Sequence, residues 1–299
     1  MEQDYGDVMD TIVKVKYKKK HHRPSAFSIT NYTLLTIIGL LCLLPFLNVL
    51  AAALSTANLQ INFTPRGFTW FNFQTVFTDL SFFRALGVSL LVTFAGTVLS
   101  VSVMYFAAYA LSKPTLPFRK GIMIFFIITM IFSGGMVPNY IVMETLGLTR
   151  TVFSLIFPSV LQVYNLILMK SYIEGLPKEL EESAFIDGAT EFQTLTKIIM
   201  PLSLPSIASV ALFTAVTYWN NYTNALIYLG TEEKWYPLSL YILNHINSAA
   251  DPLVYTKADV QKSNIESAMI VVSIIPILIV YPFVLKHFTK GVTVGSVKE

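Results

Sequence analysis

The sequence predicts an all-α integral membrane protein with six transmembrane helices and both termini in the cytoplasm. Of its 299 residues, 54% are hydrophobic and only 13% are charged, whereas a soluble domain carries about 25% charged residues. The mean hydropathy of +0.59 points the same way. The 21 basic and 18 acidic residues all lie outside six charge-free windows, at 31–54, 85–111, 121–142, 151–169, 203–229 and 267–285.

Each window is long enough to cross a membrane as a helix. The windows hold 19 to 27 residues, and about 20 helical residues span a hydrocarbon core of about 30 Å. The first and last windows are rich in leucine and isoleucine and give the strongest prediction. The window at 203–229 is the weakest, because Trp219 to Asn224 make its last third polar.

The windows define the organisation of the chain. A basic N-terminal segment occupies residues 1–30, a six-helix transmembrane domain residues 31–289, and a C-terminal tail residues 290–299. Two long loops interrupt the domain, one at 170–202 between the fourth and fifth spans and one at 230–266 between the fifth and sixth.

The orientation follows from the basic residues. Fifteen of them lie on the side of the two termini and six on the other side, so the positive-inside rule places the termini in the cytoplasm. The Lys18–Lys20 run suits anionic lipid headgroups, and the net charge of +3 is too balanced to indicate a nucleic-acid partner. A cleavable signal peptide is the competing interpretation of the start, but its apolar stretch is too long.

The sequence lacks the residues that several functional classes of protein require. Carriers coupled to protons or ions usually hold charged residues within their spans, and the six windows contain none. No nucleotide-binding G-x-x-x-x-G-K-[ST] loop and no catalytic motif occurs, so we expect no enzymatic activity. The lone Cys42 and four scattered histidines give no metal-ligand spacing. Uphill transport would therefore need energy from another subunit.

The loop at 170–202 is expected to be a helical hairpin. Pro177 suits a first helical position, Asp187-Gly188 suits a turn, and Thr190 with Gln193 forms a capping box that begins a second helix. Pro201 is expected to end that helix. Six acidic residues against three lysines oppose binding to the anionic membrane surface, so the hairpin is predicted to dock on another protein.

The hairpin also resembles a known motif. Glu182-Ser183-Ala184, then Gly188, then Ile198 and Met200-Pro201 look like the E-A-A…G…I-x-L-P coupling motif of permease subunits of ATP-binding cassette importers. Ser183 and Met200 depart from it conservatively.

Three further stretches resemble carbohydrate-uptake permeases of this family. Trp219-Asn220-Asn221-Tyr222 is similar to their W-N-[DE]-[FY] signature. The C-terminal stretch from Tyr281 resembles the maltose-permease G-type and the polysaccharide and lipoprotein-type sugar permeases, and Phe132 to Pro138 resembles the latter subgroup.

The resemblance implies a type I importer permease in a bacterial cell membrane. It would pair with a homologous second permease and with two ATPase subunits, which bind the ATP and magnesium, so this chain itself would bind no cofactor. A solute-binding protein outside the membrane would deliver the cargo. The residues at the ATPase-coupling surface would be Glu182, Ser183, Ala184, Asp187, Gly188 and Pro201.

Polar residues at the outer ends of two spans are candidates for the substrate path, since amides and hydroxyls satisfy sugar hydroxyls. They are Asn220, Asn221, Tyr222, Asn224, Asn139 and Tyr140. Hydrogen bonds between helices are the favoured alternative role for them. The absence of charge in the spans slightly favours a neutral sugar.

The external loop 230–266 is a candidate contact for the binding protein, through Trp235, Tyr236, His245 and Tyr255. Aromatic residues at a membrane interface are an equally good interpretation. The sequence thus predicts an ATP-driven, binding-protein-dependent importer of carbohydrate, with an oligosaccharide as its cargo. The alternatives are a permease for a non-sugar solute, such as amino acids or peptides, and a membrane scaffold without a pathway.

Overall fold

The computed structural model describes residues 26–56, 63–248 and 261–295. The regular elements in these ranges are all helices, and one isolated bridge joins Ser55 to Phe68. The predicted all-α class is therefore confirmed. The chain divides into two units, Met1–Asn48 and Val49–Glu299.

The described part of the first unit belongs to helix α2 (Ala26–Ala53), the first predicted span. It is continuous through Pro45, and most of its apolar side chains, such as Leu34, Ile37 and Leu41, are exposed. An apolar helix of this length and exposure is typical of a segment surrounded by lipid or by another chain.

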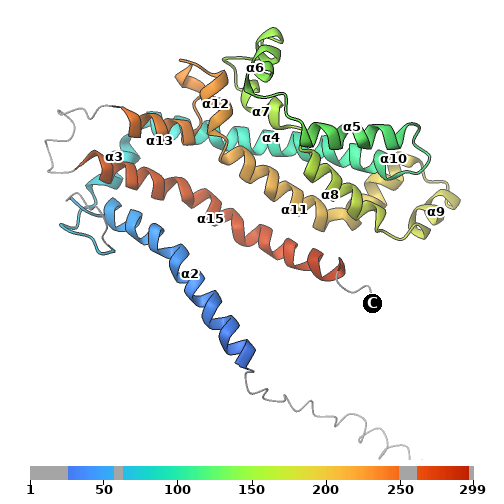
Figure 1. Cartoon of the computed structure of the whole chain (residues 1–299), viewed down its shortest axis with the longest axis horizontal. Coiled ribbons are helices and arrows are strands. Elements are labelled where there is room, and N and C mark those ends of the chain that lie inside the picture. The colour runs from blue at the N-terminus through green and yellow to red at the C-terminus, as the bar shows by residue number, and fades with distance from the viewer. Residues whose placement is uncertain (1–25, 57–62, 249–260, 296–299) are drawn as a thin grey trace, which may run out of the picture. The chain divides into compact units, whose positions relative to one another are not determined.

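Four helices organise the second unit. They are α4 (Leu80–Ser112), α8 (Val163–Glu174), α11 (Met200–Trp219) and α15 (Lys262–Gly295). Helix α11 packs against both α4 and α15, and α8 packs against α4 and α11 (Figure 1).

The contact between α4 and α11 depends on one glycine. A Cβ at Gly96 would lie 2.7 Å from the ring of Tyr218, so only glycine lets this ring approach α4. The Tyr218 hydroxyl lies 2.9 Å from Ser100 Oγ and donates to the Ile156 carbonyl at 2.9 Å. The buried hydroxyl groups of Tyr218 and Ser100 therefore both have hydrogen-bond partners.

The second unit offers straight and bent candidate spans. Helix α4, the stretch Glu191–Trp219 that ends with α11, and the Lys262–Pro282 part of α15 are long and apolar enough to cross a membrane, as is Phe27–Ala53 of α2. Two further pairs of helices are long and apolar enough only when each pair is taken together. The first is α5 (Arg119–Ile131) with α6 (Met136–Thr145), and the angle between these helices is 116°. The second joins Phe153–Ser159, which comprises α7 (Phe153–Ile156) and η1 (Phe157–Ser159), to α8 at an angle of 52°. By length and composition, the described residues therefore contain four candidate spans, or up to six if each bent pair is one. The cytoplasmic placement of the termini stays a prediction.

The predicted end of a helix at Pro201 is wrong. Helix α10 (Glu191–Thr194) continues through a π-helical stretch, η2 (Leu195–Ile199), directly into α11. A proline donates no backbone hydrogen bond and its ring crowds the carbonyl four residues earlier. The wider π turn just before Pro201 accommodates both effects, so the helix continues. The weak window at 203–229 is broken instead at Asn220, and α12 (Tyr222–Tyr228) follows.

Beyond the break, the chain forms η3 (Glu233–Trp235) and α13 (Leu238–Asn247) before α15. Helix α13 packs with α3 (Phe71–Thr78), the start of α4 and α15 around a core that includes Phe73, Phe82 and Met269. The side chain of Asn72 lies fully buried there, and its Nδ2 donates to the carbonyls of Ala53 and Ser55, each at 2.9 Å.

We expect Asn72→Leu to destabilise this end of the unit by about 1–3 kcal/mol, because the buried Ala53 carbonyl loses its side-chain donor, whereas the Ser55 carbonyl keeps Asn264 Nδ2 at 2.8 Å. The measurement is thermal unfolding of the purified protein in detergent. Gln74→Leu, on the exposed side of the same helix, is the matched control and should leave the transition unchanged. An equal shift in both variants would contradict this role for Asn72.

Candidate functional site

The segment between α8 and α11 forms the predicted hairpin. Helix α9 (Glu179–Ile186) begins with three acidic residues in its first turn, where the helix dipole favours them. It starts two residues after Pro177, which therefore lies before the helix. The helix ends at Asp187, and Gly188 takes a φ of +80°.

The turn and the second helix are both fixed by local hydrogen bonds. The Ala189 N–H donates to the Ala184 carbonyl at 2.9 Å, which closes the turn. Thr190 and Gln193 form the predicted capping box, in which each side chain accepts a hydrogen bond from the backbone N–H of the other residue. Two helices joined at Asp187-Gly188 are therefore confirmed, with the second continuing into α11.

The candidate coupling residues differ in exposure. Ala184 is buried, whereas Glu182, Ser183, Asp187 and Gly188 are exposed. Pro201 lies beyond the hairpin, in the first turn of α11. Two apolar side chains not identified from the sequence extend the exposed surface, namely Ile186, 86% exposed, and Phe192, 65% exposed. We call the hairpin tip the exposed residues Glu182, Ser183, Ile186, Asp187, Gly188 and Phe192.

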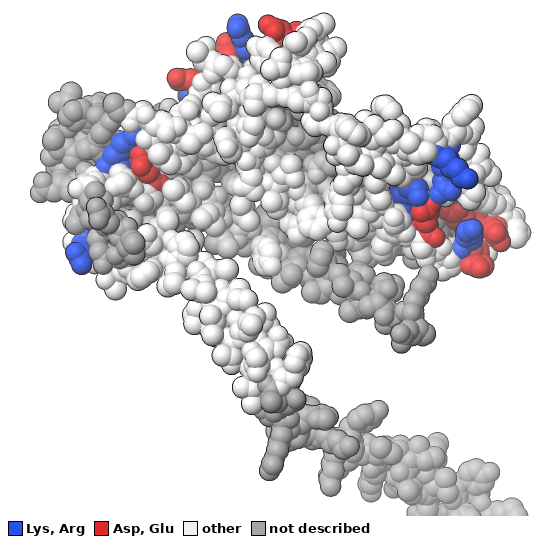
Figure 2. Space-filling model, in the orientation of Figure 1, with Lys and Arg blue, Asp and Glu red and all other residues white. Residues whose placement is uncertain are grey.

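Charged residues gather where the hairpin meets the ends of α4 and α8. Figure 2 shows this group of blue and red side chains at the right of the view. Lys113 forms an ion pair with Glu181, and Arg119 forms one with Glu174. Lys170 Nζ also lies 2.8 Å from a Glu174 oxygen. Between these side chains lies an open cleft of roughly 400 Å³.

Four of the six acidic residues of the hairpin segment fall into two contrasting groups. Glu181 and Glu174 face basic residues of this chain, whereas Glu182 and Asp187 form no ion pair with any residue that the structure describes. On a helix, neighbouring residues point about 100° apart. The tip therefore presents its negative charge and its two apolar side chains outward, as a docking surface requires.

The candidate path residues of the fifth span lie at the break between α11 and α12. Asn221 caps α12 by accepting from the Asn224 N–H at 3.1 Å. The side-chain amides of Asn221 and Asn224 both point to the Ser159 hydroxyl, at 3.5 and 3.4 Å. Asn220 and Tyr222 are exposed. The structure therefore brings two of the amides to one serine and leaves the other two side chains exposed, with Asn220 Nδ2 donating to the Val216 carbonyl of its own helix at 3.0 Å.

Asn139 and Tyr140 lie on α6 beside α12. The ring of Tyr140 stacks on that of Tyr228, with 6.2 Å between centroids and 14° between planes. Asn139 and Tyr228 line a mostly apolar cavity of roughly 600 Å³ with Met143, Phe157 and Pro158. These candidates are thus near Tyr228, which the sequence did not single out because it stands in an apolar run.

Trp235 and Tyr236, two of the candidate contacts for a binding protein, are half-buried rather than freely exposed. Trp235 ends η3, and the Tyr236 hydroxyl donates to the Gly230 carbonyl at 2.5 Å. Burial raises the pKa of the Tyr236 phenol, and the nearby Glu233 carboxylate raises it further. Tyr236 is therefore a neutral hydrogen-bond donor at physiological pH.

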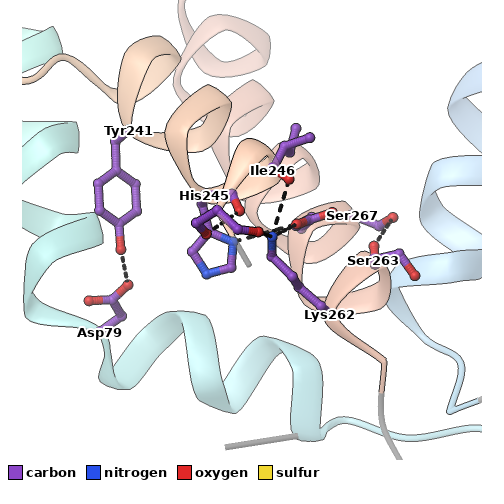
Figure 3. Close-up of polar contacts among 9 residues, drawn as sticks. Asp79, Tyr241, His245, Ile246, Lys262, Ser263 and Ser267 are labelled. Carbon is purple, nitrogen blue, oxygen red and sulfur yellow. Dashed lines mark hydrogen bonds and ion pairs between the residues drawn. The ribbon is translucent and has the colours of Figure 1, made fainter. Parts of the chain in front are cut away.

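His245 belongs to a polar network on α13 (Figure 3). Its Nδ1 lies 3.7 Å from a Glu266 oxygen, and Lys262 Nζ lies 3.3 Å from the same oxygen. Lys262 also donates to the carbonyls of Ile246 and Ser248. One turn earlier, Tyr241 donates to Asp79 at 2.5 Å. These contacts tie α13 to α4 and α15. Tyr255 lies outside the described residues.

Comparison with known proteins adds a family match, two relatives and a solved structure. The family described as "Binding-protein-dependent transport system inner membrane component" matches residues 85–294. The chain is 37% identical to the polygalacturonan/rhamnogalacturonan transport system permease protein YtcP of Bacillus subtilis, over 91% of this chain and 98% of that protein. It is 38% identical to protein LplC of the same organism, over 91% and 95%.

A solved structure is also similar. It is that of a bacterial ABC transporter involved in the import of the acidic polysaccharide alginate, with a TM-score of 0.81 and 30% sequence identity. The similarity covers 88% of this chain and 96% of that chain.

Proposed function

The chain belongs to the family of binding-protein-dependent transport system inner membrane components, and from that premise we propose that it carries an oligosaccharide through the bacterial cell membrane. It is a multi-pass permease subunit of an ABC importer and a transport component rather than an enzyme. In our proposal it forms one half of the pathway, and a homologous second permease forms the other half.

The hairpin tip is proposed to couple this pathway to a separate pair of ATPase subunits. The observation that carries this proposal is the outward presentation of Glu182, Asp187, Ile186 and Phe192 around Gly188. Unpaired carboxylates beside apolar anchors suit a cleft on another protein. ATP binding in the partner would then bias a rigid-body switch in the permease pair.

Carbohydrate is proposed as the cargo because the similar permease and the similar importer act on polysaccharides. The path would use amides and hydroxyls at the break between α11 and α12, where Asn220 and Tyr222 are exposed. The charge-free windows favour a neutral sugar, while the similar importer takes an acidic polysaccharide. The test of cargo therefore includes both neutral and acidic oligosaccharides.

We expect the complex purified through this chain to contain an ATPase, and to import oligosaccharide into proteoliposomes only with ATP and an external binding protein. The measurement compares uptake of labelled galacturonate oligosaccharides, neutral arabino-oligosaccharides and a peptide. Uptake of the peptide alone would favour the non-sugar alternative. Absence of a co-purifying ATPase would favour the scaffold alternative and contradict the proposal.

A further inference from the structure

One face of α4 and its C-cap residue contact all three helical stretches that flank the hairpin turn, namely α9, α10 and η2. Tyr105 and Tyr109 stand four residues apart, so they lie on the same side of the helix, and Lys113 is the C-cap residue directly after its last turn. The hydroxyl of Tyr105 donates to the Leu195 carbonyl in η2 at 3.0 Å, and that of Tyr109 donates to Glu191 Oε2 in α10 at 2.8 Å. Lys113, the last of the three, pairs with Glu181 in α9. We call these three residues the α4 clamp.

The two tyrosines of the clamp are buried, and its ion pair is mostly covered although it borders the open cleft. Tyr105 and Tyr109 are only 2% and 8% exposed, and the Lys113 Nζ lies 4.4 Å above the Tyr109 ring. The side chains of Lys113 and Glu181 are about four-fifths covered, at 20% and 22% exposure. Polar contacts that are shielded in this way hold their geometry better than the exposed ion pairs of a surface.

The clamp and the tip use different sides of the hairpin. Glu181 turns toward α4, whereas its neighbour Glu182 is exposed at the tip. Leu195 and Ile199 also belong to the same buried cluster as Met104, Tyr105 and Tyr109. A partner can therefore occupy the tip without displacing the clamp.

We propose that Tyr109 and Lys113 are positioning residues for energy coupling: they fasten both helices of the hairpin to α4, so that hairpin motion moves α4 together with α8 and α11. Chain continuity alone would transmit that motion only to α8 and α11, which lead into and out of the hairpin. Helix α4 packs against both of them. This inference rests on the proposed function, because it assumes that ATP drives the hairpin.

The test uses the complete complex in proteoliposomes and measures sugar imported per ATP hydrolysed. We expect Lys113→Glu, Glu181→Lys and Tyr109→Phe to assemble with the ATPase yet to lower this ratio by at least about fivefold, the lower end of typical coupling between sites. The charge-swapped double variant, Lys113→Glu with Glu181→Lys, should recover half or more of the wild-type ratio. Lys120→Glu, the same charge change at an exposed position, should leave the ratio unchanged.

The outcomes separate the clamp from a merely structural role and from the proposed function. An unchanged ratio in Tyr109→Phe and Lys113→Glu, with uptake and ATP hydrolysis falling together as the amount of complex falls, would overturn the inference. The inference would also be overturned if the charge-swapped double variant recovered none of the lost ratio of sugar imported per ATP hydrolysed. If Lys113→Glu does not assemble, Tyr109→Phe decides, because it removes one hydroxyl only. A wild-type complex without ATP-driven uptake would instead refute the proposed function.

Discussion

Gly188→Pro and Gly188→Glu are expected to abolish ATP-driven uptake while the protein still reaches the membrane. The φ of +80° at Gly188 is closed to proline, whose ring fixes φ near −65°. Proline would also lose the Gly188 N–H that donates to the Phe185 carbonyl at 3.1 Å. A left-handed conformation costs glutamate about 1–2 kcal/mol, and its side chain would hold the hairpin tip away from a close-fitting partner. The measurement is uptake in cells, normalised to the amount of protein in the membrane.

Two smaller substitutions separate the causes. Apart from its two chain neighbours, no atom of the described residues lies within 4 Å of a Cβ added at Gly188, so further steric effects at this site come from a partner. Asparagine tolerates the left-handed conformation, whereas alanine adds less bulk. Poorer uptake with Gly188→Ala than with Gly188→Asn would assign the loss to backbone strain, and the reverse order to bulk. Near-normal uptake with Gly188→Glu, with the ATPase bound, would defeat the assignment of the coupling site.

Replacing residues 249–260 by a short Gly-Ser linker is expected to remove the stimulation of ATP hydrolysis by the binding protein. This segment contains Tyr255, a candidate contact, and loss of an interface anchor typically costs at least about 2 kcal/mol, or roughly thirtyfold in affinity. Basal hydrolysis should persist. The measurement is ATPase activity of the reconstituted complex as the concentration of binding protein is raised.

Contacts on both sides of residues 249–260 set the limits of this replacement. Residues 244–247 belong to α13, and His245 and Ile246 contact Glu266 and Lys262, so a longer deletion would disturb α15 as well. Lys262 also reaches the Ser248 carbonyl, which means that a short linker can join the two ends. A Gly-Ser linker of the original length is the control for loop length. Unchanged stimulation in both variants would exclude the segment from the contact.

The helical class and the hairpin could be predicted because both depend on local signals. Charge-free windows report how apolar a stretch is, and the Asp187-Gly188 turn and the Thr190 capping box each depend on residues within three positions. The continuation through Pro201 could not be predicted in the same way. It depends on a π turn that the preceding residues adopt in this packing.

The α4 clamp was also beyond sequence analysis. Tyr109 and Glu191 are 82 positions apart, and nothing in either local pattern connects them. Likewise, the window at 121–142 is charge-free and mostly apolar, with Asn139 and Tyr140 only near its end, so its composition could not reveal the bend between α5 and α6. The Ser133-Gly134-Gly135 stretch marks the place, but glycines in a membrane segment also occur in continuous helices.

That bend has a consequence for the surroundings of residues 132–135. Helix α5 has 13 residues and is therefore about 20 Å long, roughly 10 Å short of the hydrocarbon thickness. The chain then leaves the helical path, and Gly135 adopts a φ of +85°. Peptide groups that lack helical partners cannot rest against acyl chains, because no solvent there can hydrate them. In the assembled transporter these four residues must therefore border water or another subunit rather than lipid.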